Sequence, residues 1–106
     1  MKDFSTPPDH VNFLAKKLFH GMGEIVDGAI AYLEPGGGGP LELHTHEHSH
    51  LFIVVEGEAK AMMDGKEVII RKNESLLVNG EIPHSVWNNS QGATVMVGIS
   101  VKPHPK

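Results

Sequence analysis

The sequence contains no cysteine, and this absence excludes both disulfide bonds and thiolate metal sites. Any bound metal ion must therefore be held by nitrogen and oxygen atoms. Charge is also sparse, because charged residues make up 21% of the chain and the formal net charge is −4. Such a mild balance gives no electrostatic footprint for nucleic acid or for an anionic membrane surface, so we expect neither as a partner.

Long apolar runs are missing as well. A run such as LFIVV at residues 51–55 is far too short to span a bilayer, and the first residues, MKDFSTPPDH, lack the apolar segment of a secretory signal. We therefore expect a cytoplasmic protein. The 106 residues suit a single domain covering residues 1–106, and an apolar content of 40% is enough for a modest core.

Histidine, by contrast, is concentrated in one internal stretch. Residues 43–57 read LHTHEHSHLFIVVEG and include His44, His46, His48 and His50. Residues two apart on a strand point to the same face, so His44 and His46 would present two imidazoles side by side. Imidazole is the commonest protein ligand of divalent transition metals. A solvated tract or an expression tag is the alternative, but a tag would be contiguous and terminal. The pattern favours a metal site.

The rest of the chain alternates short apolar segments with turn signals. Residues 1–12 have no periodic pattern and predict an irregular arm. Strands are predicted at residues 24–33, 51–55, 58–63, 67–71, 75–78, 84–88 and 94–101. Many short strands without a convincing long helix predict an all-β fold, an antiparallel jelly-roll barrel that also protects the open edges of its sheets.

Three connections in this pattern carry specific expectations. Glu56-Gly57 and Asp64-Gly65 each predict a tight hairpin, and the first would pair Phe52 with Ala61 and His50 with Met63. The run PGGGGP at residues 35–40 lacks the Lys and Ser/Thr that close a phosphate-binding loop. We interpret it as a connecting loop that borders the pocket.

A further histidine, His84, opens the segment HSVWN and shares a face with Val86 and Asn88 by alternation. With it, residues 38–57 and 73–88 resemble the two motifs of the cupin superfamily. The first motif, G-x5-H-x-H-x3,4-E-x6-G, is matched at Gly38, His44, His46, His50 and Gly57. The second, G-x5-P-x-G-x2-H-x3-N, keeps its spacing at Asn73, Asn79, Glu81, His84 and Asn88, but the family's Gly, Pro and Gly are replaced.

The resemblance implies the cupin fold, a double-stranded β-helix, and a single divalent metal ion held by His44, His46, His50 and His84. His50 replaces the family's carboxylate ligand, so four neutral imidazoles leave the ion's charge undiminished. We expect a stronger Lewis acid that favours the M(II) state and an anionic, oxygen-donor small molecule as its ligand. The donor set suits Fe, Mn, Ni, Cu or Zn and does not choose among them. Cupins of this size commonly pair, so we also expect a homodimer, with residues 1–12 and the strand around Trp87 as candidate contacts.

Some residues near the motifs are candidates for the pocket wall or for the surroundings of the metal. His48 lies in the turn between ligand strands and is a hydrogen-bond donor, a proton carrier or simply a solvated residue. Met63 is a candidate apolar wall beside the metal. The others are Phe52, Glu42 and Glu81. The sequence assigns no catalytic residue.

Three functions compete at this stage. The first is a metal-dependent dioxygenase, or another metal-assisted lyase or isomerase, acting on a chelating carbonyl or enol compound. The second is a non-catalytic module that binds a metal and a small metabolite. The third is a sugar-binding or isomerase-like cupin in which the metal is incidental. One fold supports all three functions, so the choice among them depends on the residues of the site.

Overall fold

The chain is described by a computed structural model that covers residues 3–44 and 47–103, with the side chains of residues 42–44 left out. Within these residues the secondary structure is entirely β, which confirms the predicted class. The strands are β1 (Glu24–Leu33), β2 (Gly38–His44), β3 (Ser49–Glu56), β4 (Glu58–Met63), β5 (Lys66–Arg71), β6 (Ser75–Val78), β7 (His84–Asn88) and β8 (Thr94–Lys102). A helix long and apolar enough to cross a membrane is absent from this described part.

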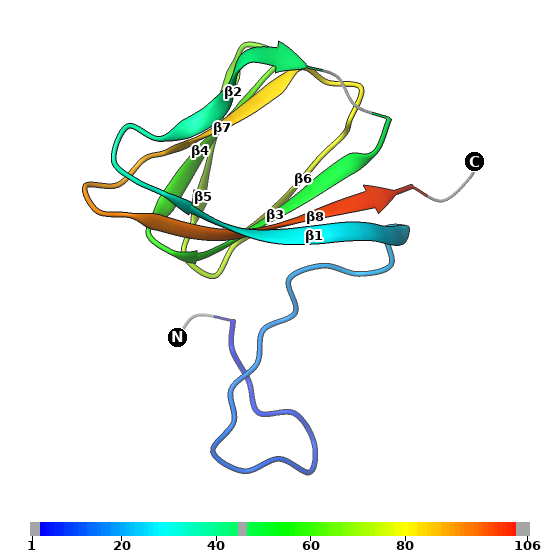
Figure 1. Cartoon of the computed structure of the whole chain (residues 1–106). Coiled ribbons are helices and arrows are strands. Elements are labelled where there is room, and N and C mark those ends of the chain that lie inside the picture. The colour runs from blue at the N-terminus through cyan, green and yellow to red at the C-terminus, as the bar shows by residue number, and fades with distance from the viewer. Residues whose placement is uncertain (1–2, 45–46, 104–106) are drawn as a thin grey trace.

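The strands form two antiparallel sheets that pack face to face (Figure 1). One sheet has the order β1-β8-β3-β6 and the other the order β2-β7-β4-β5. Strands that follow one another along the chain therefore often lie in different sheets, as expected of a jelly roll. The predicted jelly-roll barrel is confirmed.

The predicted hairpin at Glu56-Gly57 is wrong. Strand β3 pairs with β6 and β8, whereas β4 pairs with β5 and β7, so this dipeptide carries the chain from one sheet to the other. Gly57 has a φ of 82°, and a Cβ atom there would lie 2.5 Å from Thr94 Oγ1. The corner is thus a tight turn packed against β8, and a turn signal alone does not say which strands pair. The hairpin at Asp64-Gly65 is confirmed, because Met63 pairs with Lys66.

The glycine-rich connection is shorter than the sequence predicts. Its last residues belong to β2, which begins at Gly38 and pairs with Trp87 of β7 at that position. Gly38 has a φ of 153°, and a Cβ atom there would clash with the carbonyl oxygen of Val86 and the ring of Trp87. A residue without a side chain is therefore required where β2 begins to run against β7.

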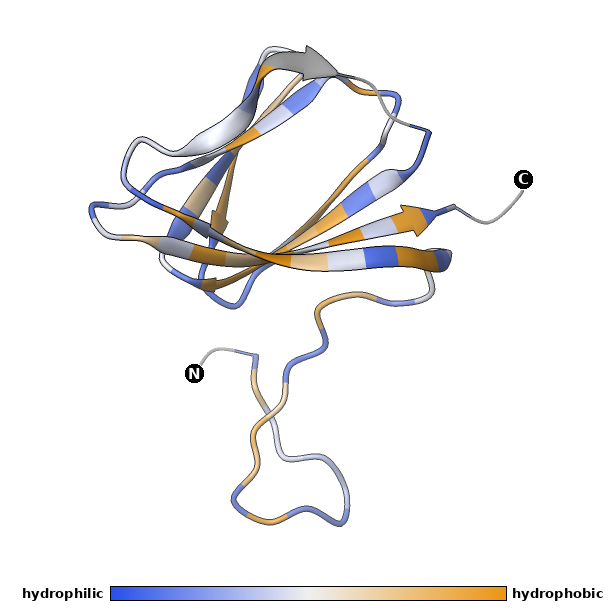
Figure 2. Ribbon diagram, viewed as in Figure 1, coloured by the Kyte–Doolittle hydropathy of each residue, from blue (hydrophilic) through white to orange (hydrophobic). Residues whose placement is uncertain are grey.

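Apolar side chains from both sheets fill the barrel. The buried core includes Leu33, Val54 and Met96 from the first sheet and Ala59, Ala61, Ile70 and Val86 from the second. The outer face of the first sheet is apolar too, since Ile30, Val97 and Ile53 form a row across β1, β8 and β3. Figure 2 shows apolar residues on these strands as well as on strands of the second sheet.

The N-terminal arm is longer than predicted and extends away from the barrel (Figure 1). It stays irregular up to Gly23, apart from an isolated bridge between Ser5 and Ala15. Near its end the arm returns to the first sheet, where the Ser75 hydroxyl donates a hydrogen bond to the carbonyl oxygen of Leu18 (2.8 Å). The arm therefore covers one part of the apolar outer face and leaves another part exposed.

Candidate metal centre and its cavity

Two of the predicted ligand histidines meet inside the barrel. His50 on β3 and His84 on β7 belong to different sheets, yet their ring centroids lie 5.4 Å apart with an interplanar angle of 54°. His84 is 4% exposed and His50 is half-buried. Two imidazoles drawn from opposite sheets to one point are the geometry expected of shared ligation rather than of independent surface residues.

The hydrogen bond of His84 fixes which ring nitrogen can act as a ligand. Its Nδ1 lies 2.9 Å from the carbonyl oxygen of Ile82. A carbonyl oxygen only accepts hydrogen bonds, so Nδ1 carries the proton and, in the neutral imidazole, Nε2 keeps the lone pair. Metal-binding histidines commonly donate their second nitrogen to a backbone carbonyl in this way. His84 therefore fits the role of a metal ligand.

An aromatic ring supports the two imidazoles from the interior. The Phe52 ring stacks near His50, with a centroid distance of 5.9 Å and an interplanar angle of 17°, and lies 6.5 Å from His84. Phe52 faces inward two residues after His50 on β3, and it pairs with Gly98 of β8, which has no side chain to displace the ring. The ring therefore restricts water on one side of the histidines.

The first histidine pair is only partly within the described structure. The backbone of His44 pairs with that of His84 in the β2–β7 register, so β2 reaches the end of the barrel at which His84 and His50 lie. The side chains of His44 and Glu42, and the whole of His46, lie outside the description. Among the described residues, no three potential ligands form a metal cluster. The pair that can be compared, His50 and His84, fits a divalent ion that accepts imidazole nitrogen.

A cavity of about 610 Å³ opens beside His50 and His84. Its apolar walls come from Ala31 and Leu33 on β1, Phe52 on β3, Val86 on β7 and Met96 on β8. A pocket of this size accommodates a small organic molecule. Since most of the wall is hydrocarbon, the two histidines form a polar patch in an otherwise apolar space.

The rim of the cavity is formed by the connection between β1 and β2. The backbone-rich segment 37–40 lies there, and its position beside the cavity agrees with the expected pocket border. Tyr32 and Glu34 also line the cavity, and both are exposed. The sequence analysis missed Glu34, the cavity residues of β1 and Met96 of β8, because the side chains of β1 and β8 that face inward become clear only once the pairing of these strands is known.

Of the other residues predicted to surround the metal, Phe52 lines the cavity, whereas Met63, Glu81 and His48 do not. Met63 pairs with His84 and packs on the core, but it does not line the cavity. Glu81 is exposed, and its backbone N–H donates to Asn79 Oδ1 (2.9 Å). His48 is half-buried, and its Nδ1 has no hydrogen-bond partner among the described residues. Phe52 is thus the member of this group that forms part of the wall.

The sequence profile of the cupin domain family, Cupin_2, matches residues 29–101, which include every strand except the start of β1 and the end of β8. The chain belongs to the cupin family. No curated protein is significantly similar to it.

Solved structures share the cupin fold with this chain. The cupin domain of an XRE family transcriptional regulator from Enterobacter cloacae has a TM-score of 0.64 at 22% identity, covering 76% of this chain and 82% of that one. A predicted oxalate decarboxylase from Thermotoga maritima has a TM-score of 0.64 at 20% identity, covering 73% and 66%. The chain spans only 65% of a conserved Streptococcus pyogenes protein of unknown function, with a TM-score of 0.63, 18% identity and coverage of 74% of this chain. At these identities the cupin likeness concerns the fold.

Proposed function

We propose that this cupin binds one divalent transition metal ion through His44, His46, His50 and His84 and takes an anionic oxygen-donor molecule into the adjacent cavity. The observation that carries the proposal is the convergence of His50 and His84 at 5.4 Å on the wall of that cavity. The hydrogen bond from His84 Nδ1 to the Ile82 carbonyl supports it, since it places the proton on Nδ1 and the lone pair on Nε2, the nitrogen that would bind the metal.

As the reaction we propose a dioxygenase-like oxidation of a chelating carbonyl or enol compound. The ion would supply Lewis acidity and a place for two oxygen atoms of the substrate. The chain itself would do the rest: His84 is held in one tautomer, Phe52 limits water beside the imidazoles, and the apolar walls orient the substrate. In a dioxygenase both atoms of O2 end in the products, so no external reductant is needed.

Metal analysis tests the first half of this proposal. The protein is purified without a tag and without chelators, and its metal content is compared with that of His44→Ala, His46→Ala, His50→Ala and His84→Ala. We expect near-stoichiometric metal in the parent and a marked loss in each variant, whereas His10→Ala, an exposed arm residue, should keep the parent's content. A parent that stays empty after reconstitution with Fe, Mn, Ni, Cu and Zn salts contradicts the metal site.

Oxygen consumption tests the second half. The Fe(II) and Mn(II) forms are supplied with a chelating diketone and with a catechol, and the uptake of O2 is followed. Turnover above that of His84→Ala supports the dioxygenase reading. Binding without turnover in any metal form favours the second candidate, a non-catalytic metal and metabolite module. That candidate is supported by the fold likeness to a transcriptional regulator's cupin domain and by a cavity whose carboxylate and imidazole side chains, among the described residues, are those of Glu34, His50 and His84.

We also propose that the chain forms a homodimer through the exposed part of the first sheet. In the described structure β1 pairs with β8 alone, so its other edge is open, and Ile30 and Tyr32 on its outer side are 59% and 71% exposed. An open edge beside apolar side chains suits a symmetric contact with a second copy. Trp87 is a weaker candidate, since it is half-buried and donates to Ser85 Oγ (2.9 Å).

Sedimentation analysis tests the dimer. We expect the parent to sediment as a dimer and Ile30→Glu to shift toward the monomer. The matched control is Leu41→Glu on β2, because Leu41 is 89% exposed but lies on the other sheet. A monomeric parent contradicts the proposal.

A further inference from the structure

We infer that the ligand of this cavity has one chelating anionic head and an apolar body the size of a ring, rather than two carboxylate groups. This inference rests on the proposed function, because the head is the part that would meet the metal ion. It goes beyond that proposal by selecting among chelating molecules through the walls of the cavity rather than through its histidines.

The volume of the cavity is the first argument. A dicarboxylate of two carbon atoms would occupy the space beside His50 and His84 and leave most of the 610 Å³ unfilled. The unfilled part would leave the half-buried apolar side chains of Ala31 and Phe52 in contact with water. A ligand with an apolar body covers this hydrocarbon surface and gains the corresponding burial energy.

The charges along the wall are the second argument. No lysine or arginine is among the described residues that line the cavity. The charged residue of that lining is Glu34, which is exposed at the rim. A second carboxylate on the ligand would therefore lose its hydration without gaining a cationic partner, and it would also be repelled by Glu34.

The positions of these groups give the ligand a direction. His50 and His84 lie at one end of their strands, whereas Leu33, Glu34 and segment 37–40 lie at the β1–β2 connection. A ligand whose head meets the histidines must therefore extend its body past Phe52 and Ala31 toward this connection. A neutral or hydrogen-bond-donating group suits the far end, because the Glu34 carboxylate at the rim can accept a hydrogen bond from it.

Calorimetric titration of the zinc-loaded protein tests the inference with three probes. Benzoylacetone and acetylacetone share one chelating head and differ by a phenyl ring in place of a methyl group, while oxalate is a dianion of small size. Zinc is chosen because it is redox-inert, so binding is measured without turnover. We expect benzoylacetone to bind about tenfold more tightly than acetylacetone, as burial of the ring's extra apolar surface requires, and oxalate to bind most weakly.

A pair of neighbouring variants locates the ring. Ala31 faces the cavity and pairs with Met96, whereas Ile30 lies on the outer side of the same strand. Ala31→Leu narrows the cavity and should remove most of the preference for benzoylacetone while keeping the zinc content and the affinity for acetylacetone. Ile30→Leu is the matched control and should behave as the parent does.

The outcomes separate this inference from the function on which it rests. Equal affinities for the two diketones, or tightest binding of oxalate, overturn the inference in a protein that holds zinc, and the metal site then stands. A protein that binds neither zinc nor any of the three probes overturns both. The expected order of affinities, lost in Ala31→Leu alone, supports the inference.

Discussion

The two ends of strand β7 carry polar side chains in contrasting surroundings. At its last residue, Asn88 joins a network of protein hydrogen bonds that includes the buried Thr94. At its first residue, His84 faces a cavity and lies beside His50 and Phe52. Both side chains point into the barrel from one strand. The contrast indicates that the hydrogen-bond network around Asn88 holds the fold together, whereas the histidines on the cavity wall lie where a small molecule can reach them.

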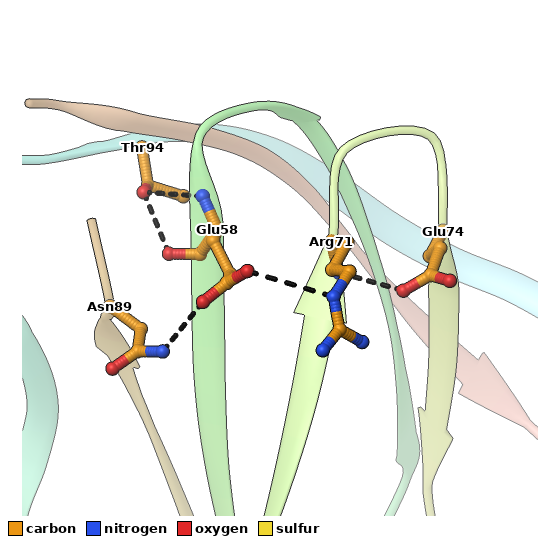
Figure 3. A network of polar contacts seen from close by, with 5 residues as sticks. All are labelled: Glu58, Arg71, Glu74, Asn89 and Thr94. Atoms are coloured by element: carbon orange, nitrogen blue, oxygen red, sulfur yellow. Dashed lines mark hydrogen bonds and ion pairs between the residues drawn. The ribbon is translucent and has the colours of Figure 1, made fainter.

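The network at the Asn88 end is dense. The Asn88 amide donates to the carbonyl oxygens of Leu33 (2.9 Å) and Gly92 (2.8 Å), and its oxygen lies 2.7 Å from Thr94 Oγ1. Thr94 Oγ1 in turn accepts the backbone N–H of Glu58 (3.1 Å). Figure 3 shows how Glu58 continues the network to Asn89 and Arg71. Asn88 therefore has a structural role, since its side chain joins segments that are distant in the sequence at this end of the barrel.

The largest loss of folding stability should come from breaking the hydrogen-bond network around Asn88. Replacing Asn88 by Leu removes the side-chain donor to the carbonyl oxygens of Leu33 and Gly92 and one of the partners of the Thr94 hydroxyl, so we expect the free energy of unfolding to fall by about 3 kcal/mol. Urea denaturation measures the loss. Metal content of the folded variant should stay at the parent's level, since the histidines lie at the other end. Loss of metal with an unchanged free energy of unfolding would contradict this prediction and would assign Asn88 to the metal site instead of the stabilising network.

A smaller loss of folding stability is expected at Gly57, where the chain crosses from one sheet to the other. Gly57→Ala places a Cβ atom against Thr94 Oγ1 and also forces a side chain onto a φ of 82°. We expect destabilisation of about 2 kcal/mol from these two effects together. Gly65→Ala is the matched control, because its φ is 80° and no atom lies within 4 Å of the added Cβ. Equal losses in the two variants would show that contact with Thr94 contributes nothing.

Gly57 also illustrates how far the sequence could predict the fold. A glycine after a polar residue marks a reversal of the chain, and that much is local chemistry. Whether the next strand pairs with the previous one or enters another sheet depends on contacts with β7 and β8, which are distant in sequence. For the same reason the hairpin at Asp64-Gly65 could be predicted and the corner at Glu56-Gly57 was mistaken for one.

For the candidate site, too, the sequence could predict one part and not another. Spacing within one segment, together with the resemblance to a known motif, was enough to single out His50 and His84, and the fold brings them together. The wall of the cavity could not be predicted, because Ala31, Leu33 and Met96 come to line the same cavity as His84 only through the packing of the two sheets. An arrangement of ligands can be encoded in a short motif, whereas the shape of a cavity is a property of the whole barrel.

A substitution of His84 tests the contrast between the two ends of β7 from the other side. In the metal-free protein, His84→Leu removes one hydrogen bond to the Ile82 carbonyl and adds apolar surface to a site that is 4% exposed. These effects oppose each other, so the free energy of unfolding should change by no more than about 1 kcal/mol in either direction. The measurement is urea denaturation beside Asn88→Leu, which lies on the same strand and face. A loss in His84→Leu as large as that in Asn88→Leu would make His84 a structural residue.

The smallest change in folding stability is expected for an exposed ion pair near the Asn88 end of the barrel. Lys72 Nζ lies 3.3 Å from Glu56 Oε2, but the two side chains are 55% and 63% exposed. Water screens such a pair and ordering two long side chains opposes it, so Lys72→Met should change the free energy of unfolding by less than about 0.5 kcal/mol. The same denaturation experiment at low and high salt should give nearly equal differences between the variant and the parent. A loss above 1 kcal/mol, removed by salt, would extend the stabilising network from the buried Thr94 out to the surface. The near-neutral result would confine it to Asn88, Thr94 and their immediate partners, where burial rather than charge makes each hydrogen bond costly to lose.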